Sequence, residues 1–185
     1  VGSGDGGLYA LDVATGRVRW RASTGGRVRS SPAIAGAKVI VGSFDGQVYA
    51  FDKASGAERW HFATEGVHFQ SDTFGYDRKS VQSSPAVAGD LVLAGARDGF
   101  FYALDLATGT QRWRVDHKIS WVNCSAATAD GSASIGSSDG AFLQALDLAT
   151  GAQRWRADTL GVIWSSPAVA GPVVYSATTR GAMFA

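Results

Sequence analysis

An eleven-residue stretch occurs four times in this chain of 185 residues and constrains its fold more than any other feature. The copies read ALDVATGRVRW at 10–20, AFDKASGAERW at 50–60, ALDLATGTQRW at 103–113 and ALDLATGAQRW at 145–155. They share the frame Ala-x-Asp-x-x-Thr/Ser-Gly, followed by three variable residues and Trp. Because self-similarity at a period of about 40–50 residues marks repeat architectures, the chain is predicted to consist of copies of one supersecondary unit.

Two further motifs recur in a constant order around this stretch. One begins each later unit, as VRSSPAIAG (28–36), VQSSPAVAG (81–89), WVNCSAATA (121–129) and IWSSPAVAG (163–171). The other is an Asp-Gly pair, a strong hairpin-turn signal, which contains Asp5, Asp45, Asp98 and Asp139. Each unit therefore divides into four short segments separated by turns, and segments such as QVYAFD alternate between two faces, as strands do.

This organisation predicts an all-β fold, a β-propeller of four-stranded antiparallel blades, because four short strands repeated every 40–45 residues or so form a blade. A helical solenoid is excluded, since turn signals about every ten residues leave no room for helices of ordinary length. About four blades are present in a single propeller segment, 1–185. Its approximate units are 1–24 (partial), 28–63, 81–116, 121–158 and 163–185 (partial).

The shared residues of the stretch have predicted structural roles. The aspartates end the third strand, and their carboxylates can accept hydrogen bonds from amides of the following turn. The glycines allow a positive φ there. The tryptophans, on the outer strand, are predicted to pack across the gap onto the next blade, against small residues such as the alanine of the stretch. The residues are Asp12, Asp52, Asp105 and Asp147; Gly16, Gly56, Gly109 and Gly151; and Trp20, Trp60, Trp113 and Trp155.

The whole chain resembles the pyrroloquinoline-quinone (PQQ) type, quinoprotein-like β-propeller repeat family. The eleven-residue stretch is similar to the tryptophan-docking motif of that repeat, and DGxxYALD and SSPAVAG resemble its remainder. The resemblance implies a bacterial, periplasmic or extracytoplasmic protein. It covers three kinds of protein: quinoprotein dehydrogenases, the BamB-like propeller lipoprotein of outer-membrane β-barrel assembly, and sensor propellers found alone or attached to bacterial Ser/Thr kinases.

Propellers of this family usually have about seven or eight blades, so three arrangements stay open here. The chain is a partial sequence of a longer propeller, or a half-ring that pairs with a second copy, or a tight four-blade ring closed by joining 163–185 with 1–24. An unclosed half-ring would expose strand edges and apolar blade faces, which favour self-association.

The composition argues against several kinds of function. A net charge of +1 gives no basic surface for nucleic acid, and no apolar run approaches the roughly 20 residues of a membrane span. Cys124 is the sole cysteine, so the adjacent cysteine pair that the dehydrogenase resemblance would imply is absent. No cluster of acidic residues suits calcium outside the turns. The expectation is therefore no catalytic residue, no metal and no cofactor, with PQQ and calcium considered only for the dehydrogenase alternative.

Departures from the repeat indicate where a ligand or partner would bind. From each Trp to the next unit the spacing is 8 residues, except that it is 21 after Trp60, so 61–80 contains an insertion. The first residues of the inner strands, aligned as Arg29, Gln82, Val122 and Trp164 and then Ser30, Ser83, Asn123 and Ser165, are expected to line the central funnel. The predicted binding face comprises Arg29, Gln82, Asn123, Trp121, Trp164, His68, Phe69, Tyr76 and Arg78.

These observations favour a non-catalytic binding or scaffold module of the bacterial envelope, of the outer-membrane assembly type, that binds a protein or a small ligand on the funnel face. The alternatives are a fragment of a PQQ-dependent dehydrogenase and the sensor propeller of a kinase.

Overall fold

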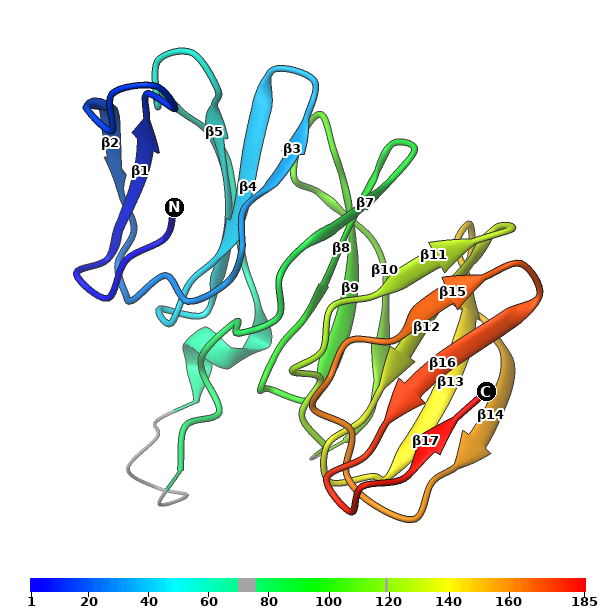
Figure 1. The fold of residues 1–185 in the computed structure, drawn as a ribbon. Coiled ribbons are helices and arrows are strands. Elements are labelled where there is room, and N and C mark those ends of the chain that lie inside the picture. Colours follow the sequence, from blue (N-terminus) through cyan, green and yellow to red (C-terminus); the bar gives the residue numbers. More distant parts are fainter. Residues whose placement is uncertain (70–75, 119) are drawn as a thin grey trace.

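A computed structural model describes residues 1–69, 76–118 and 120–185. It confirms the all-β prediction, with five antiparallel sheets and one short 3-10 helix. Figure 1 shows the sheets side by side along an arc, with the two chain ends at opposite ends of it. The arrangement is that of a partial β-propeller.

Each complete unit of the repeat forms one four-stranded sheet, in which neighbours in sequence are neighbours in space. The first comprises β3 (Ala33–Ala35), β4 (Lys38–Gly42), β5 (Gln47–Asp52) and β6 (Glu58–Ala63). The second comprises β7 (Ala86–Ala88), β8 (Leu91–Gly95), β9 (Phe100–Asp105) and β10 (Gln111–Asp116). The third comprises β11 (Ala127–Ala129), β12 (Ser132–Gly136), β13 (Phe142–Asp147) and β14 (Gln153–Asp158).

The partial units form smaller sheets at the two ends of the arc. The first contains β1 (Gly7–Leu11) and β2 (Val18–Ser23), and the last contains β15 (Ala168–Ala170), β16 (Val173–Ala177) and β17 (Met183–Phe184). The inner strands β3, β7, β11 and β15 have three residues each, shorter than the predicted segments. The proline before the first, second and fourth of them has no N–H group for a strand ladder.

The hydrophobic core lies between sheets, because the middle strands bury both of their faces. On β5, Val48 and Ala50 pack with residues of the following sheet. Tyr49 and Phe51, on the opposite face, pack with Leu8 and the sheet before. The two-face alternation expected for QVYAFD is thus observed, and each sheet is stabilised by the apolar surface it shares with its neighbours.

Each outer-strand tryptophan of the first three copies reaches the turn of the next sheet. The indole N–H groups of Trp20, Trp60 and Trp113 donate to the backbone carbonyls of Lys53, Leu106 and Leu148, at 3.0, 3.2 and 2.9 Å. The glycine of the next stretch lies directly against each ring. A Cβ atom on Gly56, Gly109 or Gly151 would stand 2.6 to 2.7 Å from the nearest indole carbon. The motif alanine instead pairs across the strands with the tryptophan of its own sheet.

The turn under each tryptophan is organised by its aspartate. One carboxylate oxygen of Asp52 accepts the amides of Ala54 and Ser55 at 3.0 and 2.8 Å, and the other accepts Arg59 at 2.7 Å. The same set recurs at Asp12, Asp105 and Asp147, and the four turn glycines have φ between 69° and 75°. The frame defined from the sequence has three variable residues before the tryptophan, but the third of them is this repeated arginine. An arginine precedes the tryptophan in every copy.

A serine at the same place in all four copies of the motif that begins each later unit connects neighbouring inner strands. The amides of Ser31, Ser84 and Ser125 donate to the hydroxyls of Ser84, Ser125 and Ser166, at 2.8, 3.0 and 3.0 Å. These contacts run from sheet to sheet along the inner edge of the arc. The inner strands are therefore joined by hydrogen bonds, while the outer strands are joined by tryptophan packing.

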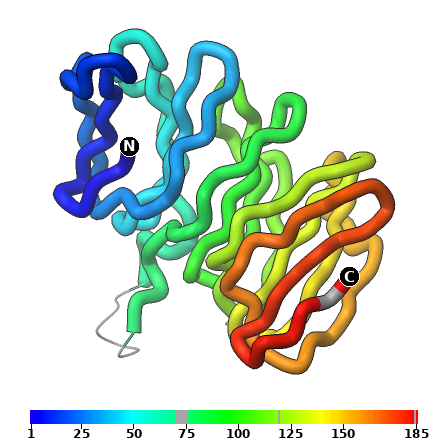
Figure 2. Tube along the Cα trace, viewed as in Figure 1, coloured from blue at the N-terminus to red at the C-terminus, as the bar shows by residue number. Residues whose placement is uncertain are grey.

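The insertion after Trp60 is held against the second sheet by its described residues. After the end of β6 it forms η1 (Glu65–His68), capped by Thr64, and the Glu65 amide donates to the Tyr102 hydroxyl at 3.0 Å. Residues 70–75 lie outside the described residues. In Figure 2 the described ends of this connection, in teal and green, project below the blue and cyan sheets.

Candidate functional site

The inner strands β3, β7 and β11 are each preceded by a side chain that bonds both backbone groups of a glycine in the neighbouring strand, and before β15 Ser165 bonds the Ala177 carbonyl at 3.0 Å. Ser30 Oγ lies 2.9 Å from both the nitrogen and the carbonyl oxygen of Gly42. Ser83 makes the same pair of contacts at 2.8 Å. In the third sheet Cys124 Sγ takes this place, at 3.2 and 3.1 Å from Gly136. These anchors give an alignment of the units that does not depend on sequence similarity.

The anchors correct the predicted alignment of the third unit by one residue. Since Cys124 is equivalent to Ser30 and Ser83, Asn123 occupies the first position and Val122 is a buried core residue. The predicted alignment was wrong for two reasons. Trp121 extends the third copy at its start, and cysteine replaces the serine that would have fixed the register. The equivalent positions are therefore Arg29, Gln82, Asn123 and Trp164.

Three of these equivalent residues line one pocket. A cavity of about 290 Å³ is bounded by Gln82, Asn123 and Trp164, together with Trp121 and Arg97. We call these five residues the inner-strand pocket. The first three come from the starts of successive inner strands, so the curvature of the arc brings them together. Four of the five belong to the binding face predicted from the sequence.

An arginine–tryptophan stack forms one wall of the inner-strand pocket. The guanidinium carbon of Arg97 lies 3.6 Å from the centre of the Trp121 ring, close enough for a cation–π interaction. Tyr76 packs edge-on against the same indole, with ring centres 5.5 Å apart. Asp77 pairs with Arg97 at 3.5 Å. Burial lowers the pKa of Arg97, and this effect outweighs the opposing carboxylates of Asp77 and Asp139.

Asp77 connects the end of the insertion to this wall. Its carboxylate accepts the Lys79 amide at 2.8 Å and the Ser80 hydroxyl at 2.5 Å. Burial acts to raise the pKa of Asp77, but these hydrogen bonds and Arg97 outweigh it, so the pKa lies below its ordinary value. Asp77 therefore stays ionised, and the salt bridge to Arg97 persists over the neutral range.

Three polar atoms of the pocket residues are buried without a hydrogen-bond partner in the described part of the chain. They are the Nε of Arg97, the Nε1 of Trp121 and the Oδ1 of Asn123. Such groups are rare in folded proteins, because each costs about 1–3 kcal/mol when it is left unsatisfied. The pocket residues therefore have two donors and one acceptor that no described residue satisfies. Trp164 is 61% exposed at the pocket edge.

The remaining residues of the predicted binding face lie elsewhere. Arg29 is exposed and stacks over Phe44, with its guanidinium carbon 5.3 Å from the ring centre. Arg78 is almost fully buried, donates to the Asp98 carbonyl at 2.8 Å and covers the Phe69 ring at 4.9 Å. His68 is exposed at the end of η1. Tyr76 packs on Trp121 but does not itself line the pocket.

Arg97 is the pocket residue that sequence reasoning missed. It stands directly before the Asp98-Gly99 turn, where the equivalent positions carry Phe44 in one unit and Ser138 in another. This variation was the available signal, since departures from a repeat indicate specificity. Variation alone did not show that the side chain reaches the inner strands.

The pocket does not suit the calcium and quinone site that the dehydrogenase alternative would require. None of the five lining residues carries a carboxylate, whereas calcium is bound by about six to eight oxygen ligands. Among the described residues, no three His, Cys, Asp or Glu side chains are grouped so that they could hold a metal ion. Likewise, no helix in the described ranges is long and apolar enough to cross a membrane.

Comparison with known proteins gives a family match over the whole chain. The sequence matches the family described as outer membrane protein assembly factor BamB, over residues 1–116 and 97–185. A search of curated proteins found no match.

Among solved structures, BamB from Moraxella catarrhalis has a TM-score of 0.80 and 25% identity, and the match covers 98% of this chain and 55% of that one. The computationally designed Ika8 protein has a TM-score of 0.79 at 18% identity, covering 98% and 52%. Quinohemoprotein alcohol dehydrogenase from Comamonas testosteroni has a TM-score of 0.67 at 21% identity, covering 82% and 32%.

The last two structures show a common fold alone, because their identities to this chain are low. The chain spans about half the length of the first two proteins. Its repeated stretch and arc of four-stranded sheets agree with the family match across all of its residues, so this chain belongs to the BamB family of PQQ-type β-propellers.

Proposed function

We propose that this chain is a non-catalytic binding or scaffold module of the bacterial cell envelope, of the outer-membrane assembly type. Its inner-strand pocket receives a group from a protein partner or a small ligand. The observation that carries the binding role is that three of the five residues lining this pocket each have a buried polar atom without a hydrogen-bond partner in the described part of the chain. Membership of the outer membrane assembly family supports the envelope setting. The proposal assigns no cofactor.

The chemistry of the pocket indicates what it would recognise. Arg97 Nε and Trp121 Nε1 are donors that need an acceptor, and Asn123 Oδ1 needs a donor. A neutral amide supplies both, whereas an anion would meet the carboxylates of Asp77 and Asp139 that already act on Arg97. The exposed Trp164 offers apolar area beside these groups, and Trp, Tyr and Arg dominate the binding energy of protein interfaces. An extended peptide segment of a partner fits these requirements.

A binding measurement with purified proteins tests this function. We expect the outer-membrane β-barrel assembly protein of the source bacterium to bind the purified chain in biolayer interferometry. The double variant Arg97→Ala/Trp164→Ala should weaken that binding at least about tenfold, since truncating interface anchors typically costs 2 kcal/mol or more. Trp155→Ala is the matched control, because this tryptophan is also exposed, at 40%, and lies outside the pocket.

Two outcomes would contradict the proposal. One is the absence of binding by a wild-type chain whose thermal melt shows that it is folded. The other is an equal loss of affinity in the double variant and the control. A quinone absorbance that survives dialysis after addition of PQQ and calcium would instead favour the dehydrogenase alternative.

A further inference from the structure

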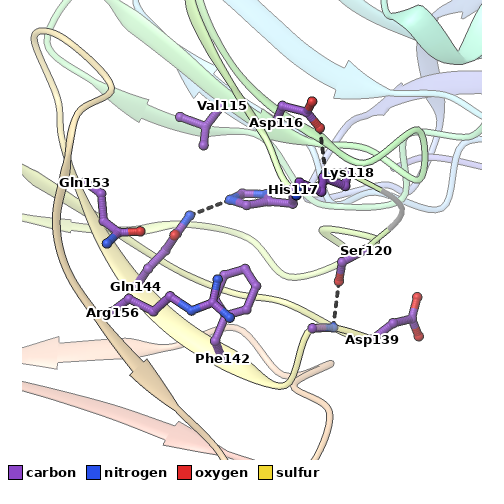
Figure 3. A pocket seen from close by; sticks show the side chains of 11 residues that line it. Val115, Asp116, His117, Lys118, Ser120, Asp139, Phe142, Gln144, Gln153 and Arg156 are labelled. Atoms are coloured by element: carbon purple, nitrogen blue, oxygen red, sulfur yellow. Dashed lines mark hydrogen bonds between the residues drawn. The ribbon is translucent and has the colours of Figure 1, made fainter.

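A second cavity lies between the outer parts of two sheets, away from the inner-strand pocket. Its volume is about 420 Å³, and its walls come from β10, β13, β14 and the turns beside them. Figure 3 shows the side chains that face it. The gap between the first and second four-stranded sheets is here called cleft 1, and the gap between the second and third, which holds this cavity, is cleft 2.

The backbone makes the two clefts comparable position by position. The Thr64 amide donates to the Gly46 carbonyl at 3.0 Å in cleft 1, and His117 makes the same contact with Gly99 at 2.8 Å in cleft 2. Lys118 is therefore equivalent to Glu65. The strand pairing sets Tyr102 opposite Arg114 and Gln144 opposite Arg156, which makes Gln144 equivalent to Tyr102 and Arg156 to Arg114.

Cleft 1 is filled by its own side chains. Tyr102 is fully buried, donates to Asp98 at 2.6 Å and packs edge-on against Phe62. Arg114 forms an ion pair with the carboxylate of Glu65, which comes from the preceding sheet. A phenol ring and a carboxylate thus occupy this gap together.

Cleft 2 lacks both of these groups. Gln144 has no ring, and the space beside it is the cavity. Lys118 replaces Glu65, so the position that supplies a carboxylate to Arg114 in cleft 1 carries a cation in cleft 2. Arg156 stacks on Phe142, with its guanidinium carbon 3.8 Å from the ring centre. Within the described ranges its carboxylate partner is Asp158 of its own strand, at 3.2 Å, and that side chain is 84% exposed.

His117 adds a buried group of its own. Its Nε2 lies 2.5 Å from the amide nitrogen of Gln144, and its Nδ1 is buried with no partner among the described residues. With the Gln144 amide donating to Nε2, a neutral imidazole carries its proton on Nδ1 and offers one unused donor. The nearby acidic groups are directed elsewhere. The Asp116 carboxylate accepts the Lys118 amide, and Figure 3 shows the Asp139 carboxylate turned away from Arg156.

We propose that cleft 2 binds a small organic carboxylate with an apolar body the size of one ring. Arg156 and Lys118, which line the same cavity, supply the positive charge, and the body lies in the cavity beside Gln144, the residue that replaces Tyr102. The ligand thereby restores the two groups that this cleft has lost. Charge-assisted hydrogen bonds from a guanidinium to a carboxylate are the strong kind, so they dominate recognition.

Benzoate is the probe for this site, because it combines one ring with one carboxylate. We expect saturable binding to the purified wild-type chain, of roughly millimolar affinity for so small a ligand, in ligand-observed NMR. Benzamide, the neutral analogue, should bind at least about tenfold more weakly. Arg156→Gln should cause a similar loss, whereas Arg114→Gln, the matched change in cleft 1, should leave the affinity unchanged.

A second variant keeps the test informative if Arg156→Gln fails to fold. The triple change His117→Thr/Lys118→Glu/Gln144→Tyr rebuilds cleft 1 in cleft 2, because threonine is the equivalent of His117 in cleft 1, so it should abolish benzoate binding without lowering the melting temperature. The proposal would be overturned if the folded wild-type chain showed no saturable binding. It would also be overturned if benzoate bound equally well to the rebuilt cleft, or if benzamide bound as tightly as benzoate.

Discussion

The outer turns and the starts of the inner strands belong to the same repeat, yet their residues vary to different degrees between the copies in this chain. Every copy of the outer turn keeps its aspartate, glycine, arginine and tryptophan with nearly the same hydrogen bonds. The equivalent positions at the inner-strand starts carry four different residues, Arg29, Gln82, Asn123 and Trp164. Repeated residues hold neighbouring sheets together, whereas varied residues surround the pocket.

The motif tryptophans also differ from one another in exposure, because their surroundings differ. Trp60 and Trp113 are 8% and 9% exposed because the turn of the next sheet covers them, whereas Trp155 is 40% exposed. Residues 163–185 contain no further copy of the turn that receives an indole. The exposure of each of these tryptophans therefore depends on whether a copy of the turn packs against its ring.

The largest expected effect contrasts two of these tryptophans. Trp113→Ala should lower the free energy of unfolding by about 3–5 kcal/mol, the usual loss for a buried aromatic side chain. Trp155→Ala should lower it by less than about 1 kcal/mol, because its ring is already partly hydrated. Urea denaturation of both variants measures the difference, and equal losses would contradict the role assigned to the covering turn.

The next contrast separates backbone strain from contact with the indole. Gly109 has φ of 75°, and an added Cβ would stand 2.6 Å from the Trp60 ring, so Gly109→Ala should cost roughly 2–4 kcal/mol. Gly16 has φ of 69° and nothing within 4 Å, so Gly16→Ala should cost roughly 1–2 kcal/mol. A Gly16 loss as large as the Gly109 loss in urea denaturation would show that the ring contact is unimportant.

A smaller effect distinguishes cleft 2 by its pH dependence. Burial lowers the pKa of His117 from 6.5 to about 4, Arg156 adds to this, and Asp116 partly opposes it. The unfolded chain then binds a proton at higher pH than the folded one, so stability is lost as the pH falls from 6.5 towards 4. Between pH 7 and 5 the free energy of unfolding should drop by about 2 kcal/mol.

His117→Thr provides the control for this pH effect, because threonine occupies the equivalent positions 24, 64 and 159. Urea denaturation at the two pH values should show a flatter dependence in this variant. If the free energy of unfolding of this variant depends on pH as steeply as that of the wild type, the titrating group is not His117.

The smallest expected effect concerns the anchor of the third inner strand. Cys124→Ser should change the free energy of unfolding by less than about 1 kcal/mol, because serine makes the same two contacts in the other sheets. Cys124→Ala should cost about 1–3 kcal/mol, since it leaves the buried backbone groups of Gly136 unsatisfied. Thermal and urea denaturation compare the two, and identical losses would argue against the anchor role.

Much of the fold could be predicted because its signals are local. Alternating hydrophobicity, Asp-Gly pairs and four tryptophans in constant phase define strands, turns and a repeating sheet without reference to distant residues. The candidate site was predicted in part. Gln82, Asn123, Trp121 and Trp164 line the inner-strand pocket, whereas Arg29, His68, Phe69, Tyr76 and Arg78 lie outside it.

The sequence by itself determined the strands, the turns and the spacing at which sheets repeat, since each depends on neighbours within about ten residues. Only the tertiary structure decided which side chains meet between sheets: the placement of Asn123 beside Gln82, the stacking of Arg97 on Trp121 and the cavity left by Gln144. These contacts depend on how closely adjacent sheets approach and on the volumes that face each other across the gap. The local sequence pattern of one unit determines neither the distance between adjacent sheets nor the volumes that face each other.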